Sequence, residues 1–366
     1  MVAAEASDRD RMAASEDTTV VARPGAPCPY FGWYGFLPQH QNLLLDHVRT
    51  GAYRNAVQRN GPVDFMDQVV MDCGCGCGAL GLFAVQAGAK RVYAVEASRA
   101  AEHAKKLCRK AIKENKMVVL QAQVEDLQLD GVRVDVILCE GMGNLLLHER
   151  MMESFLVARD KFLKPGGKMY PSRARLHFAP FQDPFLRQAV VEGPSAFWMN
   201  ANYLGLDLQP LHETAVQSYL SQPLIGLVEP GSLLGAPSMH EFDLYKASEE
   251  DLQTVRVPVE TVALRDGLVE GLVGWFDVAF DGSNWQGWLS TAPGMPPTHW
   301  QQVKCLLTAQ LPVGRGDKIW GHVDMKANAS RSYDVWITLR TEKEERSSGC
   351  IQLHNPGYYP FPGTGN

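Results

Sequence analysis

The stretch Val69–Gly78 reads Val-Val-Met-Asp-Cys-Gly-Cys-Gly-Cys-Gly, and an amphipathic pattern follows it. An apolar run that ends in an acid, then a glycine-rich turn and a helix, indicates a buried parallel strand with its crossover helix. Glycine permits positive φ and lets a ligand approach the backbone closely. The first turn of the helix adds unpaired N–H groups. The stretch therefore predicts a ligand-binding turn in a parallel α/β sheet.

A second apolar strand, Val92–Glu96, also ends in a carboxylate, and such a residue can bind the two hydroxyls of a ribose. The spacing of Asp72, Gly74, Gly76 and Glu96 differs from the dinucleotide fingerprint G-x-G-x-x-G. It resembles motif I of the class I methyltransferases, which bind S-adenosylmethionine. A purely structural turn is the alternative, but it does not explain Glu96. We therefore expect these four residues to bind S-adenosylmethionine.

Composition limits the classes of protein that fit. The 366 residues have room for two domains, and 45% hydrophobic with 21% charged residues is typical of a globular protein. The net charge of −6 argues against direct nucleic-acid binding and is compatible with a basic peptide partner. The eight cysteines have no disulfide-framework spacing, no apolar run has the length of a membrane span, and the first residues lack a signal-peptide core. We expect a cytoplasmic protein without membrane contact, with nuclear residence left open.

The pattern changes along the chain predict its domains. Residues 1–28 are polar and proline-punctuated, as in a disordered tail. Residues 29–58 combine an aromatic stretch with a helical pattern, and residues 59–171 alternate strands with helices, as in a Rossmann-like doubly wound sheet. The expected strands span 68–72, 92–96, 117–121 and 134–139, a helix spans Ala100–Lys113, and a turn at Lys164–Gly167 precedes the end of the unit at Tyr170–Pro171.

Short alternating strands separated by Gly, Pro and Asn turns predict an antiparallel β-barrel or sandwich in residues 172–366. An apolar and helical segment at 197–224 interrupts them, and such a surface excursion is typical of an interface. Trp198, Tyr203 and Leu206 are the expected anchors of such an interface. The expected strands are Leu176–Ala179, Thr254–Val259, Leu268–Phe280, Trp300–Leu306, Lys318–Met325 and Tyr333–Arg340.

Two acids carry the predicted chemistry. Glu140 ends the apolar strand 134–139, and Glu149 follows a glycine-containing turn at the start of a helix. Two carboxylates that face one pocket repel each other unless a cation lies between them. A planar guanidinium with five donors is the cation that best satisfies both. The alternative is a pair of ordinary polar residues on a loop and a helix start.

Several separated motifs together resemble the protein arginine methyltransferase family over roughly residues 29–353. Glu140 and Glu149 resemble its double-E hairpin, and Thr298-His299-Trp300 is similar to its Thr-His-Trp loop. The stretch Tyr30–Tyr34 matches its YFxxY motif, and Arg49 its cofactor-carboxylate arginine. Two further stretches, 275–280 and 289–300, are most similar to the coactivator-associated subgroup.

The resemblance implies a role for each matching residue. Glu140 and Glu149 would clamp the substrate arginine, and His299 would pair with Asp46 and tie the barrel to the N-terminal helix. The implied cofactor-binding residues are Tyr34, His40, Arg49, Asp72, Gly74, Gly76, Glu96, Val124, Glu125 and Met151. The implied substrate-binding residues are Tyr30, Tyr34, Leu43, Met142 and Trp300.

The expected mechanism starts from a guanidinium whose pKa lies above ~12, so free deprotonation is negligible. Hydrogen bonds to both acids would leave one nitrogen more nucleophilic and aim it at the sulfonium methyl. Glu149 or the His299–Asp46 pair would accept the proton, and we expect Glu149 to do so. Glu149→Gln and Glu140→Gln are each expected to abolish turnover and spare cofactor binding.

Four positions bear on the family pattern. Asn144 replaces a tyrosine and Gly141 a tryptophan or proline, which predicts a looser hairpin. Leu43 takes the place of a methionine, while Met151 agrees with the enzymes that make asymmetric dimethylarginine. Because leucine is smaller than the phenylalanine of symmetric-product enzymes, we expect the asymmetric product, a discrimination worth ~1–3 kcal/mol.

Cys73, Cys75 and Cys77 alternate through the glycine turn. A metal site would need convergent thiols and a fourth ligand, so we expect none, and an oxidation-sensitive thiol is the alternative. Two rival functions stay open: a catalytically silent scaffold or regulatory subunit, and a small-molecule methyltransferase. Histone tails or Arg/Gly-rich proteins are the expected substrates, and the arm could pair with itself or with a paralogue.

Overall fold

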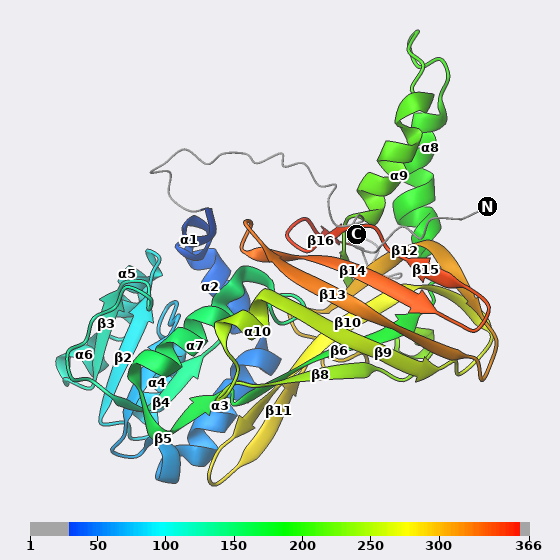
Figure 1. Ribbon diagram of the computed structural model, residues 1–366. Coiled ribbons are helices and arrows are strands. Elements are labelled where there is room, and N and C mark those ends of the chain that lie inside the picture. Colours follow the sequence, from blue (N-terminus) through cyan, green and yellow to red (C-terminus); the bar gives the residue numbers. More distant parts are fainter. Residues whose placement is uncertain (1–28, 359–366) are drawn as a thin grey trace, which may run out of the picture.

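The computed structural model describes residues 29–358, and the predicted tail 1–28 lies outside the described residues, as does 359–366. An α/β part and an antiparallel part lie side by side, and a helical arm projects from the antiparallel part (Figure 1). Within the described range no helix has the length and apolarity to cross a membrane.

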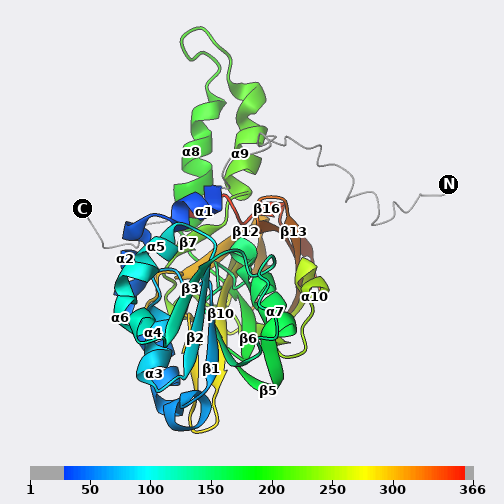
Figure 2. The same ribbon diagram turned by 90° about the vertical axis from the view of Figure 1, so that its left-hand side faces the viewer.

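The α/β part is a parallel sheet with strand order β3-β2-β1-β4-β5. Its central strand is buried from Val70 to Cys73, as expected for a strand covered on both faces. Helices α3 and α4 lie on one face and α7 on the other (Figure 2). Because the strand order reverses between β1 and β4, a crevice is expected at their carboxyl ends. The elements are α1 (Pro29–Tyr34), α2 (Leu37–Leu45), α3 (His47–Asn60), β1 (Val69–Cys73), α4 (Ala79–Gln86), β2 (Arg91–Glu96), α5 (Ala100–Leu107), α6 (Arg109–Lys113), β3 (Met117–Gln121), β4 (Val134–Cys139), α7 (Met151–Phe162) and β5 (Leu163–Tyr170).

The predicted Rossmann-like sheet is confirmed, with three local differences. The helix expected over Ala100–Lys113 is divided at Cys108, and α3 continues to Asn60, past the boundary expected at residue 58. The turn predicted at Lys164–Gly167 is wrong, because these residues lie within β5. The register between β5 and β4 shifts there, so that the extra residues bulge out of the strand instead of ending it.

The antiparallel part contains two sheets whose apolar faces meet. One has the order β17-β7-β12-β10-β6-β8 with β11 on β10, and the other β15-β14-β13-β9 with β16 on β14. Five of the six predicted strands lie within β6, β9, β10, β13 and β14, and the sixth, Trp300–Leu306, begins two residues before β12. The elements are β6 (Arg173–Phe181), β7 (Leu224–Gly226), β8 (Ser238–Asp243), α10 (Glu249–Gln253), β9 (Thr254–Val262), β10 (Gly267–Asp281), β11 (Gln286–Ser290), β12 (Gln302–Val313), β13 (Lys318–Asn328), β14 (Ser332–Arg340), β15 (Glu345–Ser347), β16 (Ile351–Gln352) and β17 (Gly357–Tyr358).

The two parts share one hydrophobic core. Tyr53 of α3 is fully buried, and its ring meets that of Phe280 of β10 edge to face at 4.9 Å. The hydroxyl of Tyr170 donates to Asp64 at 2.5 Å, and Phe65 packs on the same tyrosine ring. The domains are therefore one packed unit, and residues of both can build a common site.

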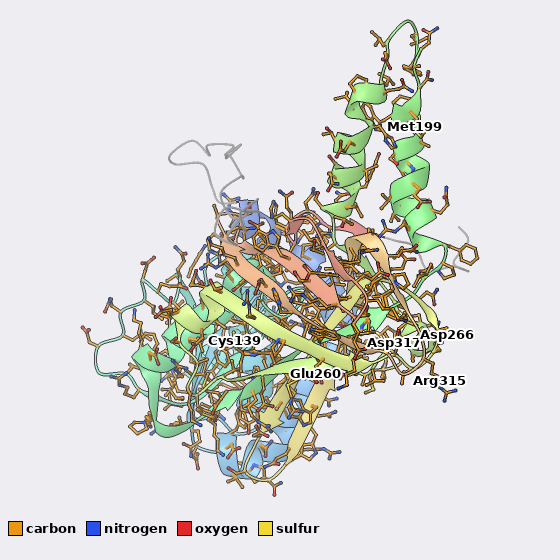
Figure 3. The ribbon with its side chains drawn as sticks, turned by 45° about the vertical axis from the view of Figure 1, so that its right-hand side comes forward. Cys139, Met199, Glu260, Asp266, Arg315 and Asp317 are labelled. Carbon is orange, nitrogen blue, oxygen red and sulfur yellow. The ribbon has the colours of Figure 1, made fainter. Side chains whose placement is uncertain are left out.

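The arm is a helical hairpin that stands away from both sheets (Figures 1 and 2). It begins with a π-helix at Gln188, earlier than the expected start at Phe197, and continues through α8 (Gly193–Ala196). The return helix α9 (His212–Leu220) ends before β7, so the last predicted arm residue, Leu224, belongs to the sheet. Figure 3 shows Met199 in the arm, remote from Cys139 at the end of β4.

Candidate active site

A cavity of about 430 Å³ lies at the carboxyl ends of β1, β2 and β4 and beneath α1 and α2. Residues from both domains line it, as the shared core allows. Of the predicted site residues, Asp46 and Asp72 do not line it. The lining includes Tyr30, Tyr34, His40, Leu43, Arg49, Gly74, Gly76, Glu96, Val124, Glu125, Glu140, Met142, Glu149, Met151, His299 and Trp300.

The glycine turn is shaped by its backbone and by Glu96. Gly74 and Gly76 have φ of 72° and 53°, where glycine is favoured. A Cβ on Gly76 would lie 2.8 Å from the ring of His40. Glu96 accepts the N–H of Gly76 at 2.8 Å and that of Ser98 at 2.7 Å. A carboxylate has about four acceptor sites, so Glu96 can still bind two hydroxyls.

Asp72 supports this turn from below. It is fully buried, accepts the N–H of Gly81 at 2.7 Å and thereby fixes the start of α4 on β1. Burial raises the pKa of Asp72 to about 7. The structure thus places Asp72 outside the lining of the cavity, where it holds α4 on β1, and its contact with a bound cofactor stays a prediction.

Arg49 of α3 and Glu140 after β4 form a buried ion pair inside the cavity. The Arg49 Nε donates to Glu140 Oε2 at 2.7 Å, and its Nη2 donates to the same oxygen. Burial opposes the charge on Arg49, yet the carboxylate keeps the pKa of Arg49 above its ordinary value. The resemblance assigned these two residues to different ligands, but here they bind each other.

Glu149, the second of the two predicted catalytic acids, also lies in the lining of the cavity. It accepts the hydroxyl of Tyr34 at 2.7 Å. The pKa of Glu149 is raised to about 7, chiefly because burial penalises the carboxylate; Glu140 adds to the increase, and Tyr34, Tyr30 and Arg331 oppose it. The two acids therefore share one cavity but have different environments.

The loop that carries Glu149 has an unusual backbone. Leu145, Leu146, Glu149 and Arg150 all have positive φ without being glycine. Each such residue costs on the order of 1 kcal/mol and persists only where the surroundings enforce it. The geometry of this loop is thus imposed by packing, and we infer that it serves the position of Glu149.

Hydrogen bonds and close packing also support the loop that follows Glu140, which was expected to be looser than in the family. The indole N–H of Trp300 donates to the carbonyl of Met142 at 3.0 Å, and the Gly143 N–H donates to the carbonyl of Leu146. A Cβ on Gly141 would lie 3.0 Å from that of Met151, so no room exists there for tryptophan. The departures from the family pattern therefore do not leave the loop unsupported.

His299 and Asp46 form the expected pair at the edge of the cavity. The His299 Nδ1 lies 2.7 Å from Asp46 Oδ2, and its backbone N–H donates to the same oxygen at 2.9 Å. The other oxygen of Asp46 caps α3 through the Arg49 N–H. Burial opposes ionisation, but the hydrogen bonds from His299 and Arg49 outweigh it and lower the pKa of Asp46. The antiparallel domain is thus joined to the helix that carries Arg49.

The remaining wall of the cavity comes from α2, α7 and the loop after β3. His40 Nε2 lies 2.7 Å from the carbonyl of Tyr34. The Ser154 hydroxyl donates to Glu125, next to the buried Val124. The methyl group of Met151 lies 3.0 Å from where a Cβ on Gly74 would be.

Among the lining residues that the sequence did not lead us to expect, Arg331 and His148 lie near the acids. Arg331 belongs to the turn between β13 and β14, and His148 precedes Glu149. His148 lies next to a predicted acid, which is a signal that could have marked it. Arg331 carries no such signal, because only the packing of the two domains brings it to the cavity.

The cysteines of the glycine turn do not form a metal site. Across residues 29–358 no cluster of three or more His, Cys, Asp or Glu side chains could hold a metal ion. Burial raises the pKa of Cys75 and of Cys77, and it therefore favours thiols over reactive thiolates.

The comparisons with known proteins agree with this arrangement. A family model described as the arginine methyltransferase oligomerization subdomain matches residues 172–345, and one described as a methyltransferase domain matches residues 70–167. The chain is 44% identical over 315 residues to the probable histone-arginine methyltransferase CARM1 of Oryza sativa subsp. indica, and 41% identical over 336 residues to the histone-arginine methyltransferase CARMER of Drosophila persimilis. These matches cover 85% and 92% of this chain but 58% and 62% of the relatives.

Solved structures of arginine methyltransferases share the fold, among them the following two. Protein arginine methyltransferase 10 of Arabidopsis thaliana matches with a TM-score of 0.80 and 31% identity, over 88% of this chain and 99% of that one. The Trypanosoma brucei PRMT1 enzyme–prozyme heterotetrameric complex with AdoHcy matches with a TM-score of 0.76 and 30% identity, over 87% and 99%. Fold and cavity define a methyltransferase-type α/β domain joined to an antiparallel oligomerization domain. The chain belongs to the protein arginine methyltransferase family.

Proposed function

We propose that the protein transfers a methyl group from S-adenosylmethionine to a guanidinium nitrogen of arginine residues in protein substrates. One observation carries the proposal: Glu140 and Glu149 line one cavity beside the glycine turn, and Glu140 already binds a guanidinium, that of Arg49. A planar cation with several donors fits a place between these carboxylates.

The lining residues fit S-adenosylmethionine. The turn at Gly74 and Gly76 allows close approach, Glu96 has acceptor sites left for a ribose, and Arg49 offers a cation to a carboxylate. His40, Val124, Glu125 and Met151 complete the wall. When bound, this cofactor supplies an electrophilic methyl group.

The protein's own residues would prepare the attacking nitrogen. Both acids accept hydrogen bonds from the substrate guanidinium and hold it in one orientation, and Tyr34 fixes the carboxylate of Glu149. Glu149 is the proposed proton acceptor, because a carboxyl with a pKa of about 7 can take a proton at neutral pH. The His299–Asp46 pair, at the cavity edge, is the second candidate.

We infer that the product is asymmetric dimethylarginine. Leu43 and Met151 line the cavity, and neither fills the space that a phenylalanine would occupy. The test is incubation with labelled S-adenosylmethionine and an arginine-rich peptide, histone-tail or Arg/Gly-rich, followed by mass spectrometry of the methylarginines. The absence of methylarginine would refute the activity, and symmetric dimethylarginine would refute the product type.

We further propose a homodimer formed by the arm. Phe197, Met199, Leu204, Leu206 and Leu211 are between 47% and 87% exposed, which is unusual for an apolar set on one protrusion. Sedimentation of wild type and of Leu206→Asp tests it, because a charge at an apolar interface should yield monomers. A monomeric wild type would contradict the proposal.

A catalytically silent subunit is the second candidate, because one similar structure is an enzyme–prozyme complex. The position of both acids in the cavity favours an enzyme. If the pure protein is inactive but increases the activity of a related methyltransferase, the silent role applies. Protein substrates of the histone type would place the protein in the nucleus as well as the cytoplasm, which fractionation of tagged protein would test.

A further inference from the structure

The turn between β13 and β14 reaches the candidate active site from the antiparallel domain. Asn328 and Ser332 pair where the strands end, so Arg331 lies at the last position of the turn. Its φ is 53°, in the region that favours glycine, and its side chain lines the cavity. The chain thus has an arginine where the backbone alone would favour glycine.

The Arg331 guanidinium contacts the helix that covers the cavity. Its carbon lies 4.7 Å from the ring centre of Tyr30 and 5.8 Å from that of Phe31, both in α1. Such cation–π contacts are attractive, most of all where water is excluded. The ring of Tyr30 is 5.0 Å from that of Tyr34, which donates to Glu149. Contacts therefore run from Arg331 through α1 to the acid.

The residue after Arg331 contacts the residue before Glu149. The hydroxyl of Ser332 lies 2.8 Å from Nδ1 of His148, the residue before Glu149. Burial and the neighbouring His354 lower the pKa of His148 to about 4, so the imidazole is neutral at pH 7. Arg331, the last residue of the turn, and Ser332, the first residue of β14, thus contact α1 and the loop that carries Glu149, respectively.

The guanidinium groups of Arg331 and Arg49 have different kinds of partner. Arg49 is paired with Glu140, whereas in the described part of the chain Arg331 has no carboxylate within ion-pair distance, and its Nε is buried without a hydrogen-bond partner. Its positive charge still favours the ionised form of Glu149. Stacking on rings therefore keeps a cation near Glu149 without occupying the carboxylate.

We propose that Arg331 is a positioning residue that holds α1 closed over Glu149 and leaves this carboxylate free for the substrate arginine. The inference rests on the proposed methyl transfer for its kinetic consequence, but its structural part does not need that activity.

Arg331→Gly is the main test, because glycine suits the backbone at φ 53° and the variant therefore removes the side chain without adding backbone strain. Hydrogen exchange of residues 29–34 should be faster in R331G. The matched control is R315G, in the turn between β12 and β13, which Figure 3 shows remote from Cys139 at the cavity end of β4. Equal exchange of residues 29–34 in wild type and R331G would overturn the proposal, and so would equally faster exchange of these residues in R315G.

Kinetics give the second readout. Glu149 faces Tyr30 and Tyr34 from α1, Glu140 after β4, and Arg331 from the turn. Loss of Arg331 should reduce kcat/KM for peptide about tenfold and shift its acid limb to higher pH. R331K should restore the acid limb, since the charge returns, but not the protection of α1, since an ammonium cannot stack as a planar group. An unshifted acid limb in R331G would contradict the proposal. If wild type methylates no arginine peptide, the proposed function fails, and the exchange experiment still decides whether Arg331 holds α1.

Discussion

The guanidinium of Arg49 donates two hydrogen bonds to a single carboxylate oxygen of Glu140. One residue comes from a helix of the N-terminal segment and the other from the end of β4, and both are buried. The predicted cofactor side and the predicted substrate side of the cavity are therefore electrostatically connected. A substitution on the substrate side is therefore expected to affect ligand binding on the cofactor side.

Glu140→Gln is expected to weaken cofactor binding as well as turnover. Removing one partner of a buried ion pair costs about 3–5 kcal/mol, because the other charge is left uncompensated. Calorimetric titration with S-adenosylhomocysteine and thermal unfolding measure both effects. Glu149→Gln is the matched control, since Glu149 pairs with a neutral tyrosine, and it should abolish turnover while cofactor affinity is kept. Equal affinities in the two variants would contradict the connection and restore the simpler expectation from the sequence.

The pH dependence of kcat/KM should follow the ionisation of the Glu149 carboxyl group. Only the ionised carboxylate can accept hydrogen bonds from a guanidinium at both oxygens, so kcat/KM for peptide should fall as the pH drops through about 7. The measurement is a pH profile at low peptide concentration. A profile that stays flat from pH 8 to 5 would mean that Glu149 is not the acid that titrates.

The raised pKa of Glu149 also predicts how the free energy of unfolding depends on pH. The pKa of Glu149 in the folded state is about 7, above its ordinary value of 4.5, so the folded state binds the proton more tightly. Protonation of Glu149 therefore adds to the free energy of unfolding. This added stability is fully present below pH 4.5 and is lost as the pH rises to 7. Glu149→Gln should therefore be more stable than wild type by roughly 3 kcal/mol at pH 8 and by little at pH 4. Denaturant unfolding at both values checks this, and equal stability at pH 8 is the contrary result.

The glycine turn offers a test with a built-in control. Gly76→Ala puts a Cβ 2.8 Å from the His40 ring at φ 53°, so it should distort the cavity and abolish cofactor binding. Gly131 also has positive φ, 71°, but a Cβ there meets nothing within 4 Å. Gly131→Ala should therefore cost only the backbone strain, ~1 kcal/mol, and keep full affinity. Equal binding by both variants would show that the space at Gly76 is not needed.

The Trp300–Met142 hydrogen bond can be removed with little loss of volume. Trp300→Phe should reduce kcat/KM about tenfold, since small displacements of a positioning loop are costly, and reduce stability by ~1 kcal/mol for the lost bond. Trp320→Phe, at a partly exposed ring on β13, is the control. Unchanged kinetics in the Trp300 variant would mean that the loop holds its shape without the indole.

The sequence predicts those parts of the site that follow chain-local patterns. Gly74, Gly76 and Glu96 could be placed because strands of a parallel sheet end at one edge, and Glu140 and Glu149 because they flank one turn. The bulge at Gly166 was mistaken for a turn because its residues favour both, and only the register with β4 distinguishes them. Propensity alone does not encode such a register.

Other features depend on contacts between distant segments. Arg49 and Glu140 were each assigned a ligand, and nothing in either local pattern indicates that they meet. Arg331 lies in a hairpin turn, where arginine is a common solvated residue. Asp72 ends a strand as a ligand-binding acid would, yet its carboxylate turns under α4 to Gly81. For Arg331 the deciding information is the packing of one domain on the other, whereas for the other residues it is the packing of helices α3 and α4 on the parallel sheet.

His299 and Trp300 are adjacent in the chain but fasten two different sides of the cavity, one through Asp46 at the start of α3 and the other through Met142 after β4. A chimera could join the α/β half of this protein to the antiparallel half of a relative. Both contacts would then be made by residues of the relative, on both sides of the cavity at once. Transferring residues 140–149 alone into another protein would likewise move the two acids without the residues that hold them in place.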